Sequence, residues 1–185
     1  MNKLLVKAIL QKAQSFNWSL QGFGMLRLYL SQEVRLHVWD SRYAVPGVSV
    51  IHTHPWDFLS QVVAGKVGNI LFNESETKGM PFHKQVIQCG PGGGLCGMPT
   101  DVLLHPAYEE LYIEGQSYTQ NAQEIHASRP ADGTVTILTR TFREDTEHAA
   151  VYWPAGTEWG SAEPRPATPE EVAAITGNAL SRWFV

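Results

Sequence analysis

The chain has 185 residues, 43% hydrophobic and 10% aromatic, which is enough for one globular domain with a substantial core. Lys and Arg number 14 against 18 Asp and Glu, so the net charge is −4, and no basic run suggests nucleic acid as a partner. No apolar stretch reaches the roughly 18 residues of a membrane span, and no signal-peptide cleavage site follows the first apolar run. We therefore expect a cytoplasmic protein that does not enter a membrane.

The N-terminal segment has the pattern of an amphipathic helix. Residues 3–15 place apolar side chains near one face at helical spacing, and lysine and glutamine elsewhere. We predict a helix within residues 1–16 that packs on a larger body, as part of one domain that spans residues 1–185.

The C-terminal segment carries the signals of a second helix after an extended, proline-rich tail, within about residues 155–185. Thr168 suits the N-cap, Pro169 the first helical position and Glu171 the last position of a capping box. Gly177 is the expected end of this helix.

The middle of the chain, about residues 24–153, consists of short runs rich in β-branched and aromatic residues, separated by turn residues. About ten such runs occur with no helical pattern between them, which predicts an antiparallel sandwich or barrel. Residues 73–100 are rich in glycine and proline, and they predict a long excursion that contains a single strand at 82–88.

Two cysteines flank a glycine-rich part of that excursion. Cys89 and Cys96 have six residues between them, which is not the spacing of a zinc knuckle or a thioredoxin motif, so we predict two reduced thiols. Segment 89–97 is either a mobile lid over the barrel mouth or a simple connection, and the sequence leaves both open.

The stretch HTHPWDF, residues 52–58, holds a candidate metal site. His52 and His54 are two positions apart in a predicted strand, so their side chains point to the same face and can offer two imidazoles to one point. Imidazole suits zinc, copper, iron and nickel. The alternative is two surface histidines beside a turn, because an H-x-H pair is by itself a weak signal.

This stretch resembles the first conserved motif of the cupin superfamily, commonly written G-x5-H-x-H-x3/4-E-x6-G. His52, His54 and Gly65 match the motif, whereas Gly47 stands one residue too close to His52. Phe58 occupies the glutamate slot, which is a departure at a ligand position.

Residues 115–130 resemble the second cupin motif, G-x5-P-x-G-x2-H-x3-N, through Gly115 and His126. A narrower resemblance, over about residues 30–160, is to small bacterial and phage cupin-like proteins with an H-x-HPWDF segment. The resemblance implies a cupin double-stranded β-helix, which is an antiparallel jelly-roll barrel, with short helices at both ends.

The resemblance also implies one divalent metal ion held by His52, His54 and His126, with iron as the first expectation and zinc, nickel or manganese as alternatives. Three histidines hold the metal in thiol-dioxygenase cupins, which this sequence resembles at superfamily level. Asp57, beside the glutamate slot, is either a fourth ligand or a residue that orders the turn and the imidazoles. His37 is expected to be an interior or edge hydrogen-bonding residue rather than a ligand.

Three further residues are candidates for a substrate pocket at the barrel mouth, namely Trp56, Tyr112 and Arg140. Arginine suits a substrate carboxylate because its planar fork pairs with both oxygens. The alternative for Arg140 is an ion pair with Glu144 or Asp145.

Three functions remain open from the sequence. The leading enzymatic hypothesis is a non-haem iron oxygenase acting on a small organic molecule, since a metal with open positions can bind dioxygen and substrate. The alternatives are a non-catalytic module that binds a small molecule or a metal, and a metal-free sugar-type isomerase or epimerase, because fold alone does not choose between them. Many cupins pair through strand edges, so the likeness also implies a homodimer.

Overall fold

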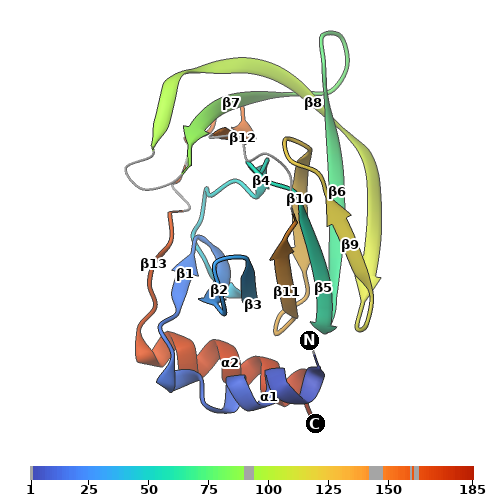
Figure 1. The fold of residues 1–185 in the computed structure, drawn as a ribbon. Helices are drawn as coiled ribbons and strands as arrows, with labels where there is room; N and C mark the ends of the chain where they lie inside the picture. The colour runs from blue at the N-terminus through green and yellow to red at the C-terminus, as the bar shows by residue number, and fades with distance from the viewer. Residues whose placement is uncertain (1, 90–93, 142–147, 159, 161–162) are drawn as a thin grey trace.

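A computed structural model describes residues 2–89, 94–141, 148–158, 160 and 163–185 (Figure 1). Over these ranges the chain forms thirteen strands, two α-helices and a short 3-10 helix. The helices are α1 (Lys3–Gln11) and α2 (Pro169–Trp183), and the 3-10 helix is Ala13–Ser15. The strands are β1 (Ser19–Gln21), β2 (Phe23–Tyr29), β3 (Val34–Ala44), β4 (Ile51–His52), β5 (Phe58–Ala64), β6 (Lys66–Ser75), β7 (Met80–Gln88), β8 (Leu95–Ile113), β9 (Ser117–Gln120), β10 (Ile125–Pro130), β11 (Val135–Arg140), β12 (His148–Pro154) and β13 (Arg165–Pro166). The predicted mainly β fold with a helix at each end is confirmed.

The strands form two antiparallel sheets. Seven strands make one sheet in the order β13-β1-β2-β3-β11-β5-β9. The other six follow the order β10-β4-β12-β7-β8-β6, and this sheet closes because β6 also pairs with β10. Strands that are distant in the sequence, such as β4 and β10, therefore become neighbours.

The strand β8 corrects the prediction for the glycine-rich excursion. It runs through 19 residues, pairs with β7 through its first half and with β6 through its second, and curves over the molecule in Figure 1. The prediction of an excursion over residues 73–100 is therefore wrong at its start, where β6 continues to Ser75, and from Leu95 onward. Pro99 lies at an irregularity of the β7–β8 register and Pro106 lies beside one in the β6–β8 register, and sheets accommodate proline at such positions.

The two helices lie side by side against the outer face of the seven-stranded sheet (Figure 1). Their apolar faces and alternate strand residues form the largest core cluster, which includes Val6, Leu10, Val172, Ile175 and Ala179 from the helices and Leu26, Leu36, Val38 and Val135 from the sheet. Within the described ranges, no helix combines the length and apolar composition that crossing a bilayer demands.

The helix α2 starts as predicted and ends later than predicted. Thr168 accepts from the backbone N–H of Glu171, whose side chain accepts from the N–H of Thr168, so the capping box is confirmed. The predicted end at Gly177 is wrong, because the helix continues to Trp183. Its buried face continues past Gly177 through Ala179, which is fully buried, so packing outweighs the weak helix propensity of glycine.

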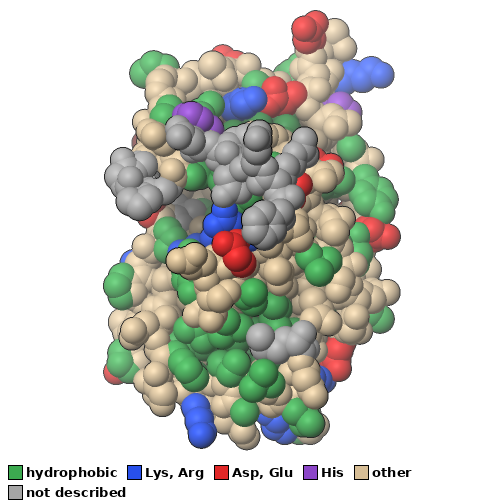
Figure 2. All heavy atoms as spheres, viewed as in Figure 1, with side chains coloured by type: hydrophobic (Ala, Val, Ile, Leu, Met, Phe, Trp, Pro, Cys, Tyr) green, Lys and Arg blue, Asp and Glu red, His purple; other side chains and the backbone are tan. Residues whose placement is uncertain are grey.

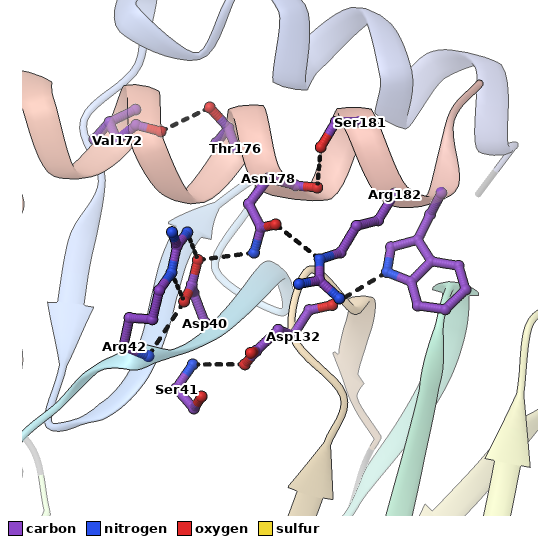
Figure 3. A network of polar contacts seen from close by, with 10 residues as sticks. Asp40, Ser41, Arg42, Asp132, Val172, Thr176, Asn178, Ser181 and Arg182 are labelled. Atoms are coloured by element: carbon purple, nitrogen blue, oxygen red, sulfur yellow. Dashed lines mark hydrogen bonds and ion pairs between the residues drawn. The ribbon is translucent and has the colours of Figure 1, made fainter.

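A polar network fixes α2 to the end of β3 (Figure 3). The Asp40 carboxylate, only 1% exposed, accepts hydrogen bonds from the Arg42 guanidinium at 2.6 and 2.9 Å and from Asn178 Nδ2 at 2.9 Å. Burial raises the pKa of Asp40, but the hydrogen bonds from Arg42 and Asn178 outweigh it and lower this pKa below its usual value. The ionised Asp40 thus contributes to the attachment of the helix.

Candidate metal centre

A cavity of about 1040 Å³ lies between the inner faces of the two sheets. The space-filling view is hollowed near its middle, above a patch of hydrophobic side chains in the lower half (Figure 2). Because side chains alternate along a strand, β2 and β3 send every second residue into the cavity. These lining residues are Phe23, Met25, Arg27, Tyr29, Arg35, His37 and Trp39.

Three predicted histidines meet in the wall of this cavity. His52 ends the short strand β4, and His126 lies directly opposite it in β10. The Nε2 atom of His54 is 3.1 Å from the Nε2 atoms of both His52 and His126, and the three ligand atoms lie within 4.8 Å of one another. His126 is buried, and the residues His52 and His54 are each partly exposed as a whole. The structure therefore brings together a group that can hold a metal ion.

Hydrogen bonds at the opposite ring nitrogens orient two of these imidazoles. Nδ1 of His52 donates to the carbonyl oxygen of Val50 at 3.0 Å. Nδ1 of His126 donates to Oδ1 of Asn69 at 3.0 Å, while Nδ2 of Asn69 donates to Oε1 of Gln120 at 3.1 Å. A neutral ring with its proton on Nδ1 presents a lone pair at Nε2. Both rings therefore direct lone pairs at the site.

The three Nε2 atoms cannot satisfy one another. If the neutral His54 ring carries its proton on Nε2, that N–H can donate a hydrogen bond to only one of the two lone pairs that face it from His52 and His126. Buried polar atoms without partners are unfavourable, and a cation at the point of convergence would accept all three lone pairs. The donor set therefore fits a metal ion.

The protonation states also favour metal binding. Burial lowers the pKa of all three rings, and for His54 the neighbouring His52 and His126 lower it further. For His52 the hydrogen bond to the Val50 carbonyl partly opposes this shift. The rings are consequently neutral near pH 7, which is the form that coordinates a metal.

Aromatic side chains close the site on one side. Phe58, in the slot where the cupin motif has glutamate, is 2% exposed and packs its ring 5.0 Å from His54 and 5.9 Å from His126, between ring centroids. Trp56 lies 4.7 Å from His54 in the same measure. These rings hold the imidazoles in place and keep water from that side of the site.

Asp57 contacts backbone N–H groups of two other segments. Its Oδ1 accepts the backbone N–H of Ala122, and its carbonyl oxygen accepts the N–H of Thr141 at 2.9 Å. Among the described residues, the metal-ligating group contains three histidines and no carboxylate. The contact with Ala122 agrees with the turn-ordering alternative, and ligation by Asp57 stays a prediction.

Of the predicted pocket residues, Trp56 and Arg140 line the cavity. Tyr112 is not among the described lining residues, and its ring instead stacks at 4.6 Å on Tyr118, which does line the cavity. Tyr112 thus supports the wall from behind.

Arg140 has a different acidic neighbour from those predicted. Its Nε lies 3.6 Å from Oε2 of Glu33, and its guanidinium lies 5.2 Å from the ring centroid of Trp56. The predicted partners Glu144 and Asp145 lie outside the described residues.

The glycine-rich segment reaches the same cavity. Cys89 and Cys96 are free thiols, and Cys89 and Gly94 line the cavity. Residues 90–93 lie outside the described part of the chain, so a lid and a simple connection both stay open for this segment.

Several polar lining residues were not assigned to a site from the sequence, among them the titratable residues Arg27, Arg35 and His37. His37 is interior, 6% exposed, and its Nε2 has no hydrogen-bond partner among the described residues. Burial, with a contribution from the positive charges of Arg35 and Arg27, lowers the pKa of His37 to about 3. The signal that points to all three is their alternation with leucine and valine along two strands.

Comparison with known proteins assigns no family to this chain. No protein-family model matches it, and no curated protein is similar enough to serve as a relative. The function has to be inferred from the geometry of the site.

Proposed function

We propose that the chain is a metal-binding cupin in which His52, His54 and His126 hold one divalent metal ion. The observation that carries the proposal is the convergence of three Nε2 atoms, two of which are fixed as lone-pair donors by hydrogen bonds at Nδ1. Second hydrogen bonds of this kind are usual for histidines that bind metals.

The backbone at the motif positions supports membership of the cupin superfamily. Gly65 and Gly115 have φ angles of +86° and +88°, and Gln123, in the second glycine slot of the motif, has a φ of +66°. Gln123 is the only non-glycine residue with a positive φ in the described part of the chain. A left-handed turn has thus been kept at a position where the residue type differs, which supports a common backbone plan.

Within this class, we favour a non-haem iron oxygenase that acts on a small organic molecule. Three neutral imidazoles leave coordination positions open, and iron held there would supply redox chemistry with dioxygen. The cavity volume suits a small organic ligand. Asn69 orients His126 while Trp56 and Phe58 exclude water from one side, so the chain supplies a rigid and partly dry site.

A non-catalytic binding module is the second candidate. The aromatic wall of Trp56, Phe58 and Tyr118 favours it, because such a wall binds a ligand by stacking without supplying an acid or a base. A metal-free isomerase has less support, since a histidine with a strongly lowered pKa is a weak base near pH 7.

Metal analysis by mass spectrometry tests the proposal, using protein purified without chelators or a metal-affinity column. We expect a stoichiometric divalent metal in the wild type and in His148→Ala, a control at an exposed histidine that begins β12. The variant His126→Ala should contain almost none. A wild type that takes up no iron, zinc, nickel or manganese, or equal metal content in His126→Ala, would contradict the metal site.

The type of metal then separates the two candidate functions. Stoichiometric iron with oxygen consumption on addition of a small organic acid would support the oxygenase. Stoichiometric zinc or nickel without turnover would favour the binding module. The homodimer implied by the likeness to cupins stays a prediction that light scattering can test.

A further inference from the structure

We propose that Arg27 and Arg35 form an anion-binding subsite in the cavity, so that its ligand is a small organic molecule with a carboxylate or phosphate group. This inference deepens the proposed function, on which it rests, because it names the class of ligand that the same cavity takes.

The strand register places both arginines on the cavity face. In the antiparallel pair of β2 and β3, Arg27 lies opposite His37 and Tyr29 lies opposite Arg35. All four side chains line the cavity, while the alternate residues Leu28 and Leu36 lie in the core cluster with the helices. The two guanidiniums are therefore held on one wall by the backbone itself, and a rigid wall is what a selective binding site needs.

Neither guanidinium has an ion-pair partner in the described part of the chain. The Nε atoms of both Arg27 and Arg35 are buried there without a hydrogen-bond partner. Glu33 lies near Arg140, and its charge also acts on Arg35 from beyond ion-pair distance, while Glu163 lines the cavity and is exposed. Partly buried cations without partners are unfavourable, so an anionic ligand would remove a penalty that the free protein carries.

Aromatic rings lie against both guanidinium groups. The Cζ atom of Arg27 is 5.1 Å from the ring centroid of Tyr29, and that of Arg35 is 4.9 Å from Tyr29 and 4.8 Å from Trp56. A guanidinium has five N–H donors, and those that do not point at a ring stay available for a ligand. Those N–H groups match the two oxygens of a carboxylate or phosphate.

Trp56 connects this subsite to the histidines. The guanidinium of Arg35 lies over the ring of Trp56, and the centroid of that ring is 4.7 Å from the centroid of the His54 ring. A ligand whose anionic group lies on the arginines would therefore extend its organic part along Trp56 toward the histidine group. The buried Nε2 of His37, which lines the same wall without a described partner, offers a further polar contact.

Binding to metal-free protein tests the inference without depending on a metal. We would titrate the wild type by calorimetry with phenylacetate, phenyl phosphate and phenylacetamide, which are similar in shape and differ in charge. We expect at least one of the two anions to bind about tenfold or more tightly than the neutral amide, and the stronger anion identifies the preferred group. Binding of neither anion, or equal binding of the amide, would overturn the proposal.

Two arginine variants provide the second arm. Arg27→Met and Arg35→Met should each weaken anion binding about tenfold or more, whereas Arg129→Met, at an exposed arginine beside Glu109, should bind like the wild type. Circular dichroism shows whether each variant is folded, and the comparison of probes with wild-type protein does not require any variant. Wild-type affinity in both folded variants would overturn the subsite.

The two proposals can fail separately. Anion binding without metal uptake would refute only the metal proposal, and metal uptake without anion binding would refute only the anion-binding subsite.

Discussion

The two faces of the seven-stranded sheet are built from the same strands but have opposite character. On the outer face, Leu28 and Leu36 lie in the core beneath the helices. On the inner face, one residue away along each strand, Arg27 and Arg35 line the cavity without ion-pair partners in the described part of the chain. The outer face supplies core packing, whereas the inner face carries the unfavourable polar groups on which the proposed binding rests.

Removal of apolar volume from the outer face should have the largest effect. Leu36 is 0% exposed and lies in the core cluster, so Leu36→Ala should lower the free energy of unfolding by about 2–5 kcal/mol. Urea unfolding followed by circular dichroism would measure this. A loss well below 1 kcal/mol would show that the helices do not depend on this packing.

The buried histidine of the inner face should make stability depend on pH. The pKa of His37 is lowered to about 3 in the folded chain. Below about pH 6.5 this histidine is therefore protonated in the unfolded chain but stays neutral in the folded chain. The contribution of His37 to the free energy of unfolding is therefore highest above about pH 6.5. It falls as the pH is lowered, by about 2 kcal/mol between pH 6.5 and 5. Unfolding of metal-free wild type and His37→Leu at several pH values would measure it. Equal pH dependence in the two proteins would refute the assignment.

The polar attachment of α2 should have a smaller effect. Asp40→Asn removes the charge that Arg42 and Asn178 stabilise, and we expect a loss of about 1–2 kcal/mol at pH 7. Since the pKa of Asp40 is lowered, its contribution is present above its unfolded pKa of about 4 and disappears as the pH falls through the folded value. The difference between the two proteins should therefore shrink in acid, and a difference that is constant with pH would argue against the ionised network.

The smallest effect on stability is expected at the arginines. Arg35→Met, one residue from Leu36, should change the free energy of unfolding by less than about 1 kcal/mol, because it removes an unpaired cation but retains the apolar stem. A loss as large as that of Leu36→Ala would mean that Arg35 stabilises the fold, and would remove the contrast between the faces.

The sequence predicted the parts of the molecule that depend on local pattern. Terminal helices, the capping box at Thr168 and most of the central strands follow from periodicity and turn residues. The meeting of His52 and His54 follows from their two-residue spacing, even though the strand itself ends at His52. His126 was predicted as a ligand from the resemblance to cupins. The structure places it opposite His52, in the neighbouring strand of the sheet.

Features that depend on long-range packing were missed. The strand β8 was obscured by glycine and proline, whose local signals are overcome by pairing with two different strands. Gly177 is a local signal for a helix end. The burial of Ala179, which favours continuation of the helix, depends on tertiary packing and cannot be read from the sequence. Arg27 and Arg35 resemble ordinary surface residues until the helices show which face of the sheet is covered.

A titration of metal-free protein with Co²⁺, followed by visible absorption, tests the central claim most directly. Three converging imidazoles should give a ligand-field spectrum that saturates at a single site, and His54→Ala should abolish it because His54 contacts both other ligands. The exposed-site control His148→Ala should titrate like the wild type. Absence of a saturable spectrum in the wild type, or an unchanged titration in His54→Ala, would contradict the account.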